Sequence, residues 1–111
     1  MRFLTLYKWT PKTARAAAQR WITMFDGTAP QAVMDAIKKV KVIDIEFSAA
    51  SQFISEVYEI ADADFTSVAP AMIYLQEVFE VETHVVQSAE EWSKSWDMLE
   101  LLDKVPKPEW K

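Results

Sequence analysis

Two segments of the sequence, Arg2 to Trp9 and Gln52 to Ile60, are rich in β-branched and aromatic residues. Such residues are typical of β-strands. In both segments, the odd-numbered and the even-numbered positions include apolar side chains. Because successive side chains of a strand point to opposite faces, both strands are expected to be covered on both sides. Each segment has an aromatic residue near its end and is followed by a polar cap and a helical pattern, at an offset of about 50 residues. The sequence therefore predicts two similar halves whose first strands lie at the centre of one sheet.

The residues after the first strand have the apolar period of a helix. Thr10 and Pro11 are expected to cap and start this helix. Its apolar stripe reaches about Phe25, and Gly27 is well placed to end it. A short second helix is expected within Pro30 to Lys39, so that an insert precedes the next strand.

The remaining elements follow from changes of period. Val40 to Phe47 alternates with a period of two, which predicts a strand with one buried face. A helix is expected from about Phe65 to Glu77, and it should start late or kink because Pro70 falls near its first turn. Phe79 to Val86 predicts the fourth strand. A last helix is expected to present the apolar residues Trp92, Trp96, Leu99 and Leu102.

The resulting order, β-α-β-β-α-β with an extra C-terminal helix, predicts an α+β fold of ferredoxin-like design. Such a chain forms a four-stranded antiparallel sheet with two helices on one face. We expect residues 1–105 to form a single domain and residues 106–111 to form a tail. Two helices leave the other face uncovered, although the central strands are apolar on both sides. We therefore predict a homodimer in which two sheets meet face to face, with cover by the last helix as the alternative.

The composition excludes several classes of protein. A single glycine excludes the glycine-rich phosphate loops, and the absence of cysteine excludes disulfides and thiolate metal sites. The chain is acidic, with a net charge of −5, and its basic residues are scattered apart from Lys38 to Lys41, so no nucleic-acid partner is expected. No apolar run is long enough for a membrane span, and we read no signal peptide at the start. These features predict a cytoplasmic protein without a cofactor.

Three runs of residues resemble a known family. They are Met1-Arg-Phe-Leu-Thr-Leu-Tyr-Lys-Trp-Thr-Pro-Lys12, Phe53-Ile-Ser-Glu-Val-Tyr-Glu59 followed by Asp62, and Val78-Phe-Glu-Val-Glu82. Together they frame about 90 residues and are similar to the small prokaryotic proteins called domain of unknown function 3303, within the dimeric α/β-barrel superfamily. The resemblance implies the fold and a homodimer. It implies no functional residues, because the family has no assigned activity. The wider superfamily includes cofactor-free monooxygenases, haem-degrading enzymes and plain binding proteins, so the fold alone does not decide the function.

Polar and aromatic residues near the ends of the two central strands suggest a ligand pocket between sheet and helices. Aromatic walls and one carboxylate suit a small-molecule site. The alternative is ordinary packing of the core and its rim. The candidate residues are Tyr7, Trp9, Glu56, Tyr58 and Glu59, and His84 of the fourth strand is a sixth candidate.

His84 is the only histidine and therefore the natural candidate for acid–base chemistry. In a face-to-face dimer, the second strand of one copy could approach the fourth strand of the other. Asp44, Glu46, Glu82 and His84 could then form a cluster suited to a hard metal or a proton transfer. The alternative is that these charges lie in solvent on edge strands, where they prevent unwanted strand pairing.

No catalytic spacing is present, so no catalytic residue is assigned. The leading hypothesis is a homodimeric binding or interaction domain. The alternative is a cofactor-independent, monooxygenase-like or isomerase-like enzyme with a pocket around Tyr7, Tyr58 and His84. An enclosed pocket that touches His84 would favour the enzyme.

Overall fold

The structure is a computed structural model that describes residues 1–88 and 90. The predicted last helix and the tail lie outside these residues. In the described part, the helices are α1 (Ala14–Asp26), α2 (Gln31–Ile37) and α3 (Ala69–Gln76), and the strands are β1 (Arg2–Lys8), β2 (Val40–Ser48), β3 (Phe53–Ile60) and β4 (Glu80–Val86). None of the helices in this part of the chain is long and apolar enough to span a membrane.

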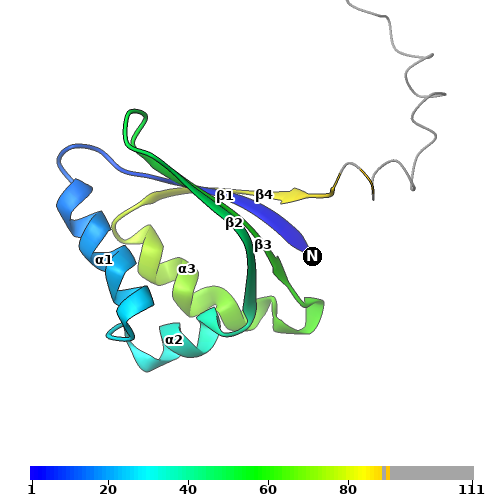
Figure 1. The fold of residues 1–111 in the computed structure, drawn as a ribbon. Coiled ribbons are helices and arrows are strands. Elements are labelled where there is room, and N and C mark those ends of the chain that lie inside the picture. Colours follow the sequence, from blue (N-terminus) through cyan, green and yellow to red (C-terminus); the bar gives the residue numbers. More distant parts are fainter. Residues whose placement is uncertain (89, 91–111) are drawn as a thin grey trace, which may run out of the picture.

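The chain has an α+β fold with one four-stranded antiparallel sheet, in the order β2-β3-β1-β4. The three helices lie on one face of the sheet (Figure 1). Strands β1 and β3 occupy the centre, which confirms the prediction from their two apolar sides. In the register, Phe3 lies opposite Tyr58, and Tyr7 lies opposite Ile54. These residues are buried under the helices, and we call their side of the sheet the helix face.

The helix face carries two clusters of buried side chains. In the first, Phe3 and Tyr58 of the sheet are packed with residues of α2 and α3, including Val33 and Ala71. In the second, Tyr7 and Ile54 are packed with Ala17 of α1, Leu75 of α3 and Phe79. The core therefore has two centres, one towards α2 and one towards α1.

The first helix begins later than predicted. Thr10 and Thr13 exchange hydrogen bonds, with the Thr10 N–H donating to Oγ1 of Thr13 (3.0 Å) and the Thr13 N–H donating to the Thr10 carbonyl (3.0 Å). These bonds hold residues 11–13 in a turn, so α1 starts at Ala14 rather than at Pro11. Its predicted end is confirmed, because Gly27 adopts a left-handed conformation (φ 81°) directly after the helix.

The third helix also starts late, which was one of the two predicted outcomes. Residues Asp62–Asp64 and Thr66–Val68 form short 3₁₀ turns, and α3 begins only at Ala69. Pro70 lies in the first turn of α3, where its missing N–H costs no hydrogen bond within the helix.

The prediction that β2 has one buried face is wrong. The register with β3 shifts between Val42 and Asp44, so that Ile43 is an extra residue in the strand. After this bulge, Ile45 and Phe47 point to the helix face, but the helices do not cover them. Val42 is 47% exposed and Phe47 is 66% exposed. β2 is thus an edge strand with apolar side chains in solvent.

The opposite side of the sheet, which we call the open face, has no helix on it in the described part of the chain. Leu4 and Leu6 of β1 and Val57 of β3 lie at its centre and are partly exposed, and Phe53 lies at the end of β3 on the same face. Charged side chains occupy the edges of this face. They include Lys41, Asp44 and Glu46 of β2 and Glu80, Glu82 and His84 of β4.

Candidate functional site

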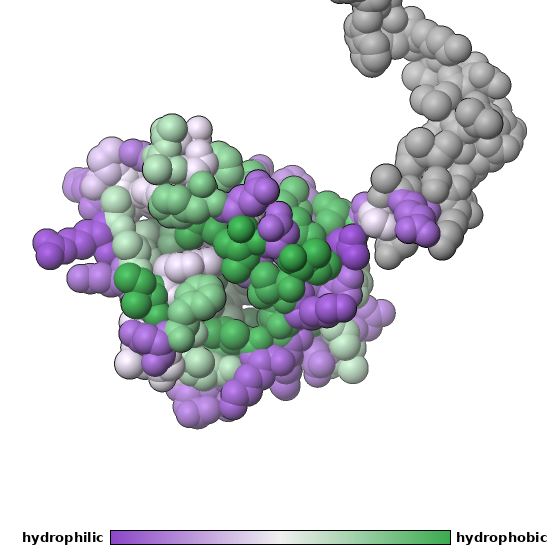
Figure 2. Space-filling model, in the orientation of Figure 1, coloured by the Kyte–Doolittle hydropathy of each residue, from purple (hydrophilic) through white to green (hydrophobic). Residues whose placement is uncertain are grey.

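A cavity of about 120 Å³ lies between the helix face of the sheet and the three helices. Figure 2 shows apolar side chains gathered around a hollow on this side of the molecule. Phe25 and Val42, which are largely exposed, mark the side of the cavity that opens to solvent. The remaining lining is mostly apolar or aromatic and includes Trp21, Met24, Ile37, Met72 and Leu75.

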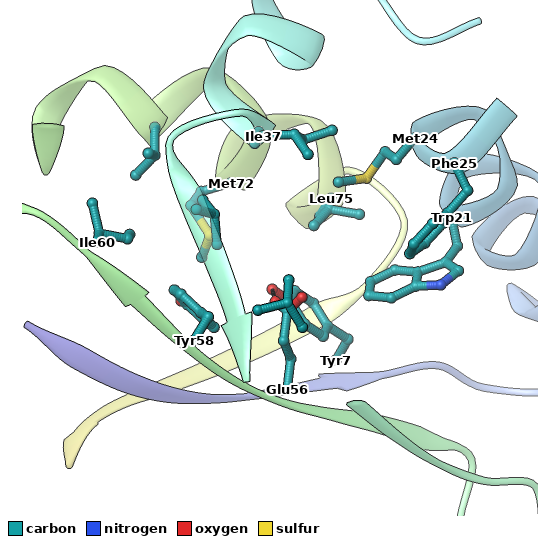
Figure 3. A pocket seen from close by; sticks show the side chains of 14 residues that line it. Tyr7, Trp21, Met24, Phe25, Ile37, Glu56, Tyr58, Ile60, Met72 and Leu75 are labelled. Carbon is teal, nitrogen blue, oxygen red and sulfur yellow. Dashed lines mark hydrogen bonds between the residues drawn. The ribbon is translucent and has the colours of Figure 1, made fainter. Parts of the chain in front are cut away.

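The floor of the cavity carries the polar groups. Tyr7, Glu56 and Tyr58 lie on adjacent positions of β1 and β3, and Figure 3 shows the oxygen atoms of Tyr7 and Glu56 close together. The Tyr7 hydroxyl donates a hydrogen bond to Oε1 of Glu56 (2.8 Å). Tyr7 is only 2% exposed, and its ring packs edge-on against Trp21 and Phe79. Tyr7 therefore holds the Glu56 carboxyl in one orientation.

Burial changes the acidity of this pair. Loss of solvent raises the pKa of Glu56 above its ordinary value, and the hydrogen bond from Tyr7 opposes this only in part. Burial also raises the pKa of Tyr7, and the negative charge of Glu56 adds to that rise. None of the ion pairs found among the described residues includes Glu56. The site thus contains a carboxyl group in apolar surroundings without a cationic partner.

The hydroxyl group of Tyr58, a second polar residue that lines the cavity, is hydrogen-bonded within the sheet. The Tyr58 hydroxyl is hydrogen-bonded to Oγ1 of Thr5 (2.7 Å), and this oxygen is also bonded to Oγ1 of Thr83 (3.0 Å). Burial raises the pKa of Tyr58. This row of hydroxyl groups crosses three strands and fixes the ring of Tyr58 at the floor of the cavity.

The sequence interpretation missed Thr5, although it is completely buried. The only signal was a polar residue between Phe3 and Tyr7 on an otherwise apolar strand face. It also missed the contributions of Trp21 and Met72, which line the cavity. Trp21 was expected on the apolar stripe of the first helix, and Met72 fell within the helix expected from about Phe65 to Glu77. Neither expectation reveals which side chains border a cavity.

The structure brings together three of the six predicted ligand residues, namely Tyr7, Glu56 and Tyr58. Trp9 lies outside this cavity and lines a neighbouring groove. Its ring stacks on that of Phe47, with 5.3 Å between the two ring centroids.

Glu59 and His84 lie on the open face. Glu59 is paired with Arg2 (2.9 Å), whereas the His84 side chain is 55% exposed and lies 3.7 Å from Glu82. An enclosed pocket that touches His84 would have favoured an enzyme. His84 is not among the residues that line this cavity.

The four residues of the suggested metal cluster lie on two opposite edges of the sheet. Asp44 and Glu46 belong to β2, and Glu82 and His84 belong to β4. The described residues contain no group of three or more His, Asp or Glu side chains that could hold a metal ion. An arrangement shared between two subunits stays a prediction.

No family model, curated protein or solved structure matches this chain. The resemblance to the dimeric α/β-barrel proteins therefore stays a prediction.

Glu56 is expected to make stability depend on pH. A carboxyl group whose pKa is higher in the folded state stabilises the fold fully below its ordinary pKa of 4.5, and this contribution is lost as the pH rises through the raised value. In Glu56→Gln the group is always neutral. The free energy of unfolding of the wild type should therefore fall relative to that of the variant as the pH rises above 4.5 and through the raised pKa of Glu56. Urea unfolding at a series of pH values measures this difference.

The control for this experiment is Glu77→Gln, which removes the same charge at an exposed position. The free energy of unfolding of Glu77→Gln should not rise relative to that of the wild type in the same pH range. Parallel curves for wild type and Glu56→Gln would show that the buried carboxyl has an ordinary pKa.

Proposed function

We propose that this chain is a small-molecule-binding domain, and that it works as a homodimer of ferredoxin-like, dimeric α/β-barrel architecture. The observation that carries the proposal is the Glu56 carboxyl, which Tyr7 orients at the floor of an apolar cavity. Burying a carboxyl group is costly, so a position with only a packing role favours an apolar residue. Small-molecule sites, in contrast, combine apolar walls with a few polar groups that orient the ligand.

The size of the cavity restricts the ligand. At about 120 Å³ it is comparable with engineered cavities of about 150 Å³, which hold a single benzene molecule. The open side between Phe25 and Val42 would give such a molecule access. We therefore propose a ligand with the dimensions of one ring and at least one polar group for Glu56.

The proposed fold and the proposed homodimer have separate support. For the ferredoxin-like fold, the strands and helices follow one another as in a split β-α-β pattern, with α2 as an addition, and all neighbouring strands are antiparallel. For the homodimer, the support is the exposed side of the sheet. On the open face, Leu4, Leu6 and Val57 form a partly exposed apolar centre. A second copy related by a twofold axis would bury this centre against its own equivalent.

A binding experiment tests the cavity. Titration of the full chain with benzyl alcohol, followed by calorimetry, should give saturable binding. Ala71→Leu adds apolar volume to a buried residue that lines the cavity, and it should weaken binding at least about tenfold. Such an addition destabilises a packed core by about 1–3 kcal/mol, so the fold is checked by circular dichroism.

The matched control is Ala32→Leu, the same change at an exposed position of α2. It should leave the affinity unchanged. Equal affinities for wild type and Ala71→Leu would place the benzyl alcohol elsewhere and remove the support for the cavity as the site.

A second function, cofactor-independent catalysis, is favoured by the raised pKa of Glu56. A carboxyl whose pKa lies closer to neutral is a better proton acceptor for a bound substrate. In that case Glu56→Gln would abolish turnover while a ligand still bound, whereas a pure binding domain would show no turnover in either form.

A further inference from the structure

Within residues 1–88 and 90, the cavity contains an acidic group without a basic partner. Among the described residues that line the cavity, Glu56 is the only acidic one, and none is Lys, Arg or His. The basic side chains that form ion pairs in this part of the chain do so elsewhere. Arg2 is paired with Glu59, for example, and Arg20 is paired with Glu77. From the residues that the structure describes, an ionised Glu56 therefore receives one hydrogen bond, from Tyr7, and no countercharge.

A bound cation would supply the missing charge. An ionised carboxylate in apolar surroundings is strongly stabilised by an opposite charge at hydrogen-bonding distance. An anionic ligand would meet repulsion both from Glu56 and from the net charge of −5 of the whole chain.

The walls of the cavity also suit a cation. Tyr7, Trp21, Phe25 and Tyr58 contribute aromatic rings to the lining. The faces of such rings attract ammonium groups, and the attraction grows when the groups are removed from water. A carboxylate together with several aromatic rings therefore favours a cation with an apolar body over a neutral molecule of the same shape.

We propose that the cavity binds a small organic cation, in which an ammonium group on an apolar body about one ring in size pairs with the Glu56 carboxylate. This inference rests on the proposed function of the cavity as a ligand site. It adds the chemical class of the ligand and makes Glu56 the residue that selects for it.

Three compounds with the same ring and different charge test the class. They are benzylamine, which is a cation at neutral pH, benzyl alcohol and benzoate. In calorimetric titrations of the full chain, benzylamine should bind at least about tenfold more tightly than benzyl alcohol, and benzoate should bind more weakly than either. In Glu56→Gln the preference for benzylamine over benzyl alcohol should disappear, whereas in the control Glu77→Gln it should stay as in the wild type.

The outcomes separate the two claims. Equal binding of benzylamine and benzyl alcohol to the wild type, with both weakened by Ala71→Leu, would overturn the cationic class and keep the cavity as a ligand site. Failure of all three compounds to bind would overturn both claims. If Ala71→Leu or Glu56→Gln left the affinity for benzylamine unchanged, the amine would be bound to the acidic surface, and the inference would be wrong.

Discussion

Replacing Tyr7 with alanine is expected to lower the free energy of unfolding by about 3–5 kcal/mol, the usual range for removing a large aromatic residue from a core. Tyr7 is 2% exposed, and its ring contacts Trp21 and Phe79 at centroid distances of 5.3 and 5.8 Å. The same change removes the only hydrogen bond that the Glu56 carboxyl makes to a side chain of the described residues. Urea unfolding followed by circular dichroism measures the loss.

Two further variants divide this effect into its parts. Tyr7→Phe keeps the ring and removes the hydroxyl, so it should cost about 1–3 kcal/mol, the price of leaving a buried acceptor without its donor. Phe47→Ala removes an aromatic ring that is 66% exposed and should cost far less than Tyr7→Ala. If Tyr7→Ala and Phe47→Ala destabilised the protein equally, Tyr7 would not belong to the core that holds the site.

Val57→Arg is expected to convert the proposed dimer to a monomer. Val57 lies on the central strand β3 and points to the open face, beside Leu4 of β1. Asp44 of β2 lies opposite Val57 on the open face and can pair with the new arginine within one subunit. In a twofold dimer, however, one substitution would still bury two large charged side chains between the sheets, and removing each of them from water costs several kcal/mol. The dissociation constant should therefore rise on the order of a hundredfold or more.

Light scattering after size-exclusion chromatography at micromolar concentration checks this result. The wild type should have twice the mass of one 12.8 kDa chain, and Val57→Arg should have the mass of a single chain. Ile73→Arg is the control, because Ile73 is 60% exposed on α3, on the other side of the sheet. A wild type of 12.8 kDa would contradict the proposed dimer, and a dimeric Val57→Arg would place the interface elsewhere.

The central strands and the C-terminal end of α1 could be predicted from the sequence because local pattern determines them. Apolar residues on both sides of the segments that form β1 and β3 indicated that these strands lie at the centre of the sheet, and Gly27 indicated the end of α1. The bulge in β2 was not predictable in this way. The extra residue Ile43 is defined only by the pairing of β2 with β3, which the period of β2 alone does not contain.

The site was predicted in part for a similar reason. Tyr7, Glu56 and Tyr58 were found because aromatic and acidic residues near strand ends are noticeable in the sequence. Glu59 was included with them, although its odd spacing from Glu56 places it on the opposite face of β3. That error was avoidable.

The role of Thr5 could not be found from the sequence. Its hydroxyl partners, Tyr58 and Thr83, lie 53 and 78 residues away, and only the folded sheet brings them together. A buried threonine on an apolar strand face looks the same in the sequence whether or not it has such partners.

The central claim is that a carboxyl group at the floor of an apolar cavity is held ready for a ligand. The most direct test is an NMR titration of the Glu56 side-chain carboxyl carbon in the full chain, with and without benzylamine. We expect the pKa of Glu56 to lie above its ordinary 4.5 in the free protein and to fall when benzylamine is bound. A pKa at the ordinary value that benzylamine does not change would contradict the account.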